Sequence, residues 1–120
     1  MVDDAVILIR ISRTYHNGIS AQELWEITRG VWRIGPRREG AQYALAVYAG
    51  HVVAVYRIRR WLPAGTLSYH TRRASSVNIP GRWEFDGEEA PPDVQAKYLG
   101  ADVRDYFPRG SQSPFRYVNC

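Results

Sequence analysis

Residues 5–12 read Ala-Val-Ile-Leu-Ile-Arg-Ile-Ser, and this stretch decides how the rest of the chain can be arranged. It is rich in β-branched residues and almost continuously apolar, a pattern typical of a strand that is buried on both faces. A strand that covers only one side of a core would alternate apolar and polar residues instead. We therefore expect residues 5–12 to form the first and central strand of a sheet.

The residues after this strand predict a short helix. Asn17-Gly18 is a typical turn pair, and Ser20-Ala21-Gln22-Glu23 matches a capping box, in which the serine and glutamate side chains satisfy free backbone amides. The helix should begin at Ala21. Gly30 should end it, in the left-handed conformation that glycine adopts readily.

A tight β-hairpin is expected in the middle of the chain. Two runs of β-branched and aromatic residues, 43–48 and 51–58, are separated only by Ala49-Gly50. Trp61 to Gly65 should end the pairing, and the polar residues 66–80 should form a long loop. The remaining chain predicts a strand at 82–86, a helix at 93–99 that Gly100 terminates, a strand or a helical turn at 103–107, and a closing strand at 115–118.

These elements indicate one α+β domain that spans residues 1–120, with five to six short strands and two or three short helices. Helices do not alternate regularly with strands, so the order favours a small barrel-like sheet over a doubly wound parallel sheet.

Composition excludes several classes of protein. Hydrophobic residues make up 45% of the chain and charged residues 23%, which argues against disordered, collagenous and coiled-coil proteins. The apolar run at residues 5–9 is far shorter than the roughly 20 residues of a membrane helix, and the start at Asp3-Asp4 is unlike a secretory signal. A cytoplasmic protein without a membrane partner is expected.

The sequence also predicts no metal and no cofactor. Cys120 is the only cysteine, so neither an internal disulfide nor a multi-cysteine zinc site can form. His16, His51 and His70 share no metal-ligand spacing, and the glycines do not form a phosphate-loop or dinucleotide motif.

Positive charge is concentrated in the first two thirds of the chain. Of 16 basic residues 15 are arginine, and residues 1–85 hold twelve of them against six acidic residues, whereas residues 86–120 hold four basic and six acidic ones. Guanidinium groups bind phosphates bidentately and stack on bases, which favours a polyanionic partner. A GC-rich genome, which encodes basic residues as arginine, would produce the same bias.

Aromatic residues lie next to many of these arginines, an arrangement suited to stacking on nucleobases. Trp32 and Trp61 lie at the ends of expected elements, where an indole can line a pocket and stack on an extruded base, although each could equally be a core residue. Trp25 and Trp83 lie inside a helix and a strand and are expected in the core.

Gly30-Val31-Trp32 after a helix, followed by a hairpin and by Trp61-Leu62-Pro63-Ala64-Gly65, resembles the YTH domain with its cage tryptophans. The order of elements resembles the PUA-like superfamily, which includes YTH, EVE and ASCH domains. Residues 11–15, Glu23-Leu24 and 28–30, with the ending Tyr117-Val118-Asn119, are similar to an uncharacterised bacterial domain of this kind, sometimes joined to defence or restriction proteins. The resemblance implies a small barrel with a cleft for a modified or extruded base.

Carried onto this chain, the resemblance implies a base-binding cage of Trp32 and Trp61, with Ser12 on its polar rim. Tyr15, next to Arg13, is a further candidate for base stacking. The chemistry of guanidinium suggests a set of phosphate-binding candidates, for each of which a solvated charged surface is the alternative: Arg13, Arg29, Arg33, Arg37, Arg38, Arg59, Arg60, Arg72 and Arg73.

The favoured function is a non-enzymatic module that binds DNA or RNA through a modified or flipped base, with a partner protein such as a nuclease as an added possibility. Two alternatives stay open. One is a small metal-independent ribonuclease with His16 or His70 as acid or base. The other is a protein-interaction module in which the tryptophans are hot spots.

Overall fold

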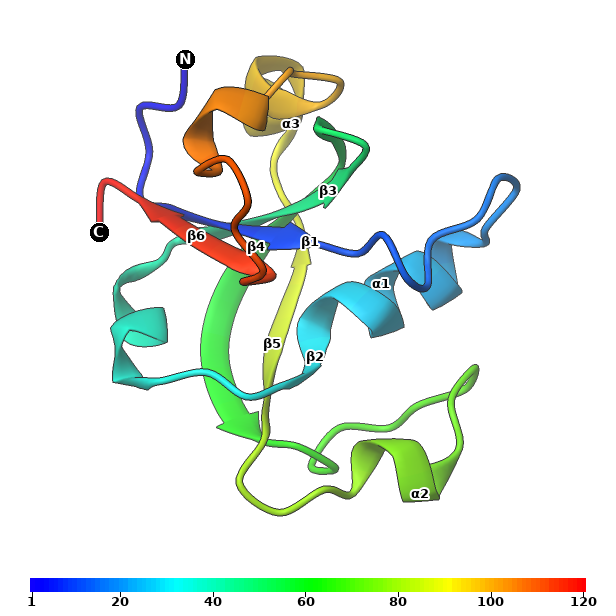
Figure 1. Ribbon diagram of the computed structural model, residues 1–120. Helices are drawn as coiled ribbons and strands as arrows, with labels where there is room; N and C mark the ends of the chain where they lie inside the picture. Colours follow the sequence, from blue (N-terminus) through cyan, green and yellow to red (C-terminus); the bar gives the residue numbers. More distant parts are fainter.

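The computed structural model describes residues 1–120 and contains one six-stranded sheet in the order β2-β5-β4-β3-β1-β6 (Figure 1). β1 and β3 run parallel, and every other neighbouring pair is antiparallel. The strands are β1 (Val6–Arg10), β2 (Gly30–Trp32), β3 (Tyr43–Tyr48), β4 (His51–Pro63), β5 (Trp83–Glu89) and β6 (Phe115–Val118). The helices are α1 (Ala21–Arg29), α2 (Ala74–Val77) and α3 (Pro92–Tyr98), with 3-10 turns at Pro36–Gly40 and Arg104–Tyr106. The expected small α+β barrel-like architecture is confirmed.

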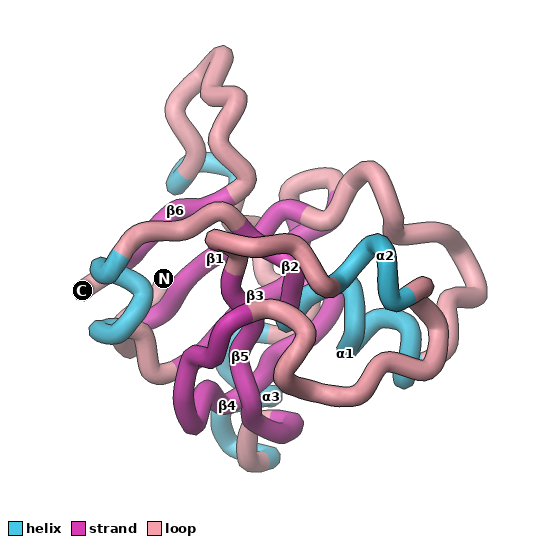
Figure 2. The backbone as a smooth tube through the Cα atoms, turned by 90° about the horizontal axis from the view of Figure 1, so that it is seen from below, coloured by secondary structure: helices cyan, strands magenta, loops and turns pink.

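The first strand is buried on both faces, as its apolar run predicts. Val6 and Leu8 belong to one core cluster, which includes residues of α3, and Ile7 and Ile9 belong to a second one, which includes Ile27 of α1. All four strand residues are fully buried. α1 and α2 lie on the same side of the strands in both views of the molecule (Figures 1 and 2).

The sheet curls until its two end strands approach each other. β2 and β6 are the first and last strands in the sheet order, yet the rings of Trp32 in β2 and Phe115 in β6 meet edge to face with 5.2 Å between centroids. This contact leaves a partly closed barrel.

The central hairpin forms as expected, but its second strand is longer. Ala49 and Gly50 both have positive φ angles, 51° and 81°, the conformation that a two-residue turn between twisted strands requires. β4 continues to Pro63, because Trp61 to Pro63 pair with Phe85 to Trp83 of β5. The expected end of the pairing at Trp61 was wrong, since β5 supplies partners that the local sequence does not show.

The N-terminal cap by Ser20 is confirmed, but the Glu23 carboxylate contacts His16 instead of completing the capping box, and the end of the helix also differs. The Ser20 side chain accepts a hydrogen bond from the Glu23 amide at 3.1 Å, and α1 begins at Ala21. Gly30 is extended, with φ at −163°, and continues directly into β2 rather than ending α1 in a left-handed turn. Glycine is needed there for a different reason: an added Cβ would lie 2.5 Å from the Tyr69 hydroxyl oxygen.

The C-terminal third follows the sequence closely. α3 is followed by Gly100, with φ at +84°, and the ambiguous segment 103–107 contains a 3-10 turn. β6 closes the sheet beside β1. None of the three helices has the length and apolar character needed to cross a bilayer.

Candidate functional site

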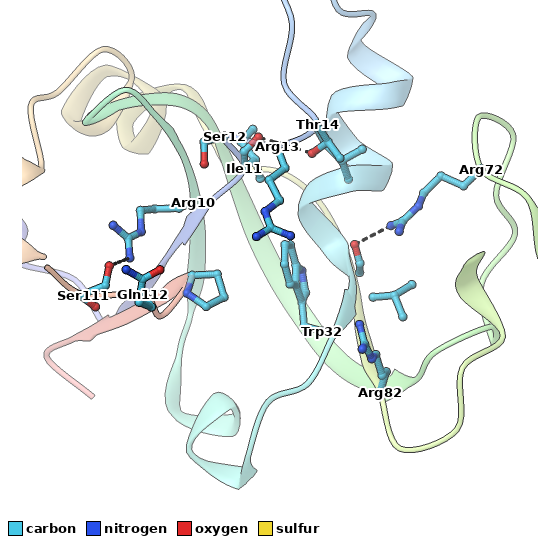
Figure 3. Close-up of a pocket in the computed structure, with 14 residues that line it drawn as sticks. Arg10, Ile11, Ser12, Arg13, Thr14, Trp32, Arg72, Arg82, Ser111 and Gln112 are labelled. Carbon is cyan, nitrogen blue, oxygen red and sulfur yellow. Dashed lines mark hydrogen bonds between the residues drawn. The ribbon is translucent and has the colours of Figure 1, made fainter. Parts of the chain in front are cut away.

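A cavity of about 730 Å³ opens where the end of β1, the α1–β2 junction and the segment before β6 come together (Figure 3). The loop after β4 and the residue before β5 complete its wall. Its lining consists of Arg10, Ile11, Ser12, Arg13, Thr14, Ile27, Gly30, Val31, Trp32, Arg72, Arg82, Ser111, Gln112 and Pro114. We refer to it as the first cavity.

The charge of the first cavity is entirely positive. Four arginines line it, at positions 10, 13, 72 and 82, and no aspartate or glutamate does. Arg10 donates to the main-chain oxygens of Ser111, at 2.9 Å, and Ser113, and its guanidinium lies 4.4 Å from the centre of the Phe107 ring. None of these contacts neutralises its charge, so the cavity attracts anions.

Two more arginines of the first cavity, Arg72 and Arg82, come from the loop after β4 and from the residue before β5. Arg72 donates to the Gly30 carbonyl oxygen at 2.7 Å (Figure 3). The Nε atom of Arg82 is buried and has no hydrogen-bond partner in the protein. The bond to Gly30 positions Arg72 in the cavity wall, to which Arg82 adds a further positive charge.

Trp32 supplies the aromatic surface of the first cavity. Its Nε1–H donates to the Thr28 carbonyl oxygen at 2.8 Å, and its ring is half-buried. The Arg13 side chain points toward this ring in the close-up (Figure 3). Because the indole N–H is already satisfied within the protein, Trp32 offers a ligand its ring rather than a hydrogen bond.

Two buried carboxylates hold the loop that carries Arg72. Glu84 of β5 is fully buried and accepts hydrogen bonds from the amides of Gly65 at 3.0 Å and Leu67 at 2.5 Å, and from the Tyr69 hydroxyl at 2.8 Å. A carboxylate with several donors is stable in the core, because its lone pairs are satisfied. The β4–β5 loop is thereby fixed by side-chain contacts rather than by regular structure.

Glu26 of α1 performs the same task at the other end of this loop. Its carboxylate is fully buried and accepts hydrogen bonds from the amides of His70 and Thr71, from the Thr71 hydroxyl at 2.8 Å and from the Gln22 side chain at 2.6 Å. Burial alone would raise the pKa of Glu26, but the hydrogen bonds from Gln22, Thr71 and His70 outweigh it and lower the pKa to about 2. The carboxylate therefore stays charged and positions Arg72, the next residue of the loop.

Four of the sequence-predicted site residues are brought together in the first cavity: Ser12, Arg13, Trp32 and Arg72. Sequence reasoning missed Arg10, Arg82, Ser111 and Gln112. Arg10 had a signal, because it is the only charged residue in the apolar stretch 5–12. Ser111 and Gln112 had none, since they lie in an irregular segment with an ordinary polar sequence.

The expected cage of two tryptophans does not form. Trp61 is only 7% exposed, packs edge to face on Phe85 with 5.2 Å between centroids, and does not line the first cavity. Its position in β4 directs the ring into the core. Tyr15 lies outside the cavity lining and packs on Tyr48 with 4.5 Å between centroids.

Two of the predicted phosphate-binding arginines have structural roles instead. Arg29 is buried, donates to the Ser68 carbonyl oxygen and lies over the Tyr69 ring. The guanidinium of Arg38 is buried 3.7 Å from the centre of the Trp83 ring. Both side chains pack over aromatic rings, Tyr69 in the β4–β5 loop and Trp83 in β5, and their burial removes them from contact with a ligand.

The other predicted arginines are exposed but dispersed. Arg33 and Arg37 line a separate cavity described below, and Arg59 forms an ion pair with Glu88. Arg60 and Arg73 are exposed and line neither cavity.

The two histidines considered for ribonuclease chemistry lie outside the first cavity. His16 is exposed and lies 3.1 Å from a Glu23 oxygen, and this hydrogen bond raises the pKa of the imidazole. The main-chain amide of His70 donates a hydrogen bond to the Glu26 carboxylate, and His70 is exposed.

In comparisons with known proteins, no protein-family model, no curated protein and no solved structure matches the chain.

Proposed function

We propose that the chain binds nucleic acid by seating one unstacked base in the first cavity, against Trp32, with the adjoining phosphates on the cavity arginines. One observation carries this proposal: a cavity of about 730 Å³ combines four arginines and an indole with no carboxylate. A nucleotide has the matching chemistry, because it joins a planar aromatic base to a negative phosphate.

The energies support a binding role. Stacking of one base on an aromatic side chain contributes roughly 1–3 kcal/mol, and arginine contacts to phosphate add a salt-dependent term. Arg10 and Arg72 are already held by main-chain oxygens, so little side-chain entropy is lost when a phosphate binds. Preorganised guanidinium groups of this kind are suited to bidentate phosphate contacts.

In its more specific form, the proposal is that the base seated in the first cavity is a modified one. Ile11, Ile27 and Val31 line the cavity together with Trp32, and a methyl group on the base would gain apolar contact there. Ser12, Thr14 and Gln112 supply hydroxyl and amide groups that can read a base edge. The resemblance to PUA-like domains, which bind bases in a cleft of a small barrel, supports the same proposal.

We expect Trp32→Ala to weaken binding of single-stranded oligonucleotides about tenfold or more, the loss of one stacking partner. Trp32→Phe, which keeps a ring, should retain most of the affinity. Fluorescence anisotropy of labelled oligonucleotides, unmodified or carrying N6-methyladenine or 5-methylcytosine, measures the effect.

Thermal unfolding of each variant is the necessary control, because Trp32 also packs on Phe115. Equal affinities for the wild type and a folded Trp32→Ala variant would remove Trp32 from the site. Equal affinities for modified and unmodified oligonucleotides would contradict the modified-base form alone and leave nucleic-acid binding intact.

A further inference from the structure

We infer that the ligand is a strand of several nucleotides, and that it leaves the first cavity past Ser111 into a second basic cavity that binds the phosphates following the seated base. This inference rests on the proposed function and extends it from one nucleotide to an oligonucleotide. It also assigns a direction to the path across the protein surface.

The second cavity, of about 530 Å³, lies on the other side of the contact between the sheet ends. Its lining consists of Arg33, Ile34, Gly35, Arg37, Pro108, Ser111, Ser113, Phe115, Arg116 and Tyr117. Three arginines are among these residues, again without an aspartate or glutamate. Like the first cavity, it is therefore suited to an anion.

The two cavities are neighbours. Ser111 lines both of them. Trp32 lines the first and Phe115 the second, and these two rings are in edge-to-face contact at 5.2 Å. A strand whose base lies against Trp32 would therefore need to pass only Ser111 and this aromatic pair to place its next phosphates in the second cavity.

None of the three arginines of the second cavity forms an ion pair with a carboxylate. The arginines that form ion pairs in this structure are Arg38, Arg59 and Arg104, none of which belongs to this cavity. Arg37 is oriented by the Tyr117 ring, 4.7 Å from its guanidinium, and by the main-chain oxygen of Cys120 at 2.7 Å. Arg33 and Arg116 are exposed.

A third cavity shows why the path should run in this direction. It measures about 230 Å³ and adjoins the first cavity through Arg10 and Ser12. The only other arginine in its lining is Arg104, which forms an ion pair with Asp102 at 2.5 Å. This exit is smaller and adds no unpaired arginine, because Arg10 already belongs to the first cavity and Arg104 is paired with Asp102. It therefore provides a strand with fewer phosphate contacts than the second cavity does.

The test compares ligand lengths and two sets of variants. The ligands are deoxyadenosine monophosphate and single-stranded oligodeoxyadenylates of two, four and six nucleotides. The variant is the triple substitution Arg33→Gln, Arg37→Gln and Arg116→Gln, and the matched control is Arg104→Gln, which removes an exposed arginine from the opposite exit. Calorimetric titration at two salt concentrations measures binding, and thermal unfolding verifies that each variant is folded.

We expect the wild type to bind the tetranucleotide at least about tenfold more tightly than the monophosphate, because further phosphates reach arginines. The triple variant should bind the monophosphate like the wild type but the tetranucleotide roughly tenfold more weakly. The slope of its salt dependence should fall by about 0.7 for each phosphate that the variant no longer neutralises. Arg104→Gln should leave both affinities unchanged.

Two outcomes would overturn the inference in distinguishable ways. In the first outcome, the wild type binds both the monophosphate and the tetranucleotide, but the folded triple variant binds the tetranucleotide as tightly as the wild type does, or Arg104→Gln weakens binding as much as the triple variant does. The strand path is then wrong, and the base site stands. If the wild type binds none of the four ligands at low salt, the proposed function fails together with the path.

Discussion

We expect replacement of Glu26 by alanine to lower the free energy of unfolding by roughly 3–5 kcal/mol, because several hydrogen bonds to a charged, buried acceptor are lost at once. The amides of His70 and Thr71 and the Thr71 hydroxyl all donate to this fully buried carboxylate. Urea denaturation followed by circular dichroism measures the loss. Glu89→Ala, which removes an exposed carboxylate from β5, is the matched control and should change stability by less than about 0.5 kcal/mol.

The same substitution should weaken nucleic-acid binding in protein that is still folded. Arg72 follows directly on the two amides that Glu26 holds, and it lines the first cavity. Without the Glu26 carboxylate, the loop should lose its fixed position, and Arg72 should no longer be held beside Gly30. Unchanged affinity in a folded Glu26→Ala variant would show that Arg72 does not depend on this anchor.

The lowered pKa of Glu26 also predicts that the protein loses stability in acid. Its pKa is about 2 in the folded protein against an ordinary value of 4.5. Because folding lowers this pKa, the stabilising contribution is complete above about pH 4.5 and is lost as the pH falls from there to about 2. The shift corresponds to about 3 kcal/mol. Glu26→Gln, which cannot ionise, should show a smaller decrease in stability between pH 5.5 and pH 2.5 than the wild type, and an equal decrease would contradict this assignment.

Gly87→Ala is expected to destabilise the protein by about 3 kcal/mol or more, because an added methyl group has no space at this position in β5. Its Cβ would overlap the main-chain oxygen of Arg57 in the adjacent strand β4. The overlap is with backbone, so no side-chain rotation can relieve it, and the pairing of β4 with β5 would have to shift near its irregularity at Ile58 and Arg60.

Gly35→Ala is the matched control for this substitution. Gly35 has φ at −86° and nothing within 4 Å of the position that a Cβ would take. Alanine there should be neutral or stabilise the protein by up to about 1 kcal/mol, because it restricts the unfolded chain. Thermal unfolding of both variants provides the comparison. Similar stabilities for the two would show that the β4–β5 backbone can separate at Gly87 at little cost.

Features that depend on neighbouring residues could be predicted from the sequence. The Ser20 cap on the Glu23 amide and the turn at Ala49-Gly50 act through backbone geometry within a few residues, and both form as expected. The prediction for Gly30 failed because the reason for glycine there is the Tyr69 hydroxyl, which is distant in sequence. The end predicted for the hairpin strand failed for a similar reason, since β5 continues the pairing.

The candidate site shows the same division between local pattern and long-range contact. Trp32 and Trp61 looked alike in sequence, and both pair with β5. The ring of Trp61 packs on Phe85 in the core, whereas Trp32 lies in the end strand β2 beside the first cavity. Arg29 and Arg38 could not be told apart from Arg13 by sequence, because only the folded protein places aromatic rings against their guanidinium groups.

By itself, the sequence determined a strand buried on both faces, a capped helix after it, a tight hairpin, and an excess of arginine in the first two thirds of the chain. Only the tertiary structure decided which arginines meet around a cavity, which of them are neutralised, and which tryptophan borders the cavity. The physical reason is that backbone preferences are local, whereas the cavity exists because the sheet curls and brings Arg10, Trp32, Arg72, Arg82 and Ser111 together from distant parts of the chain.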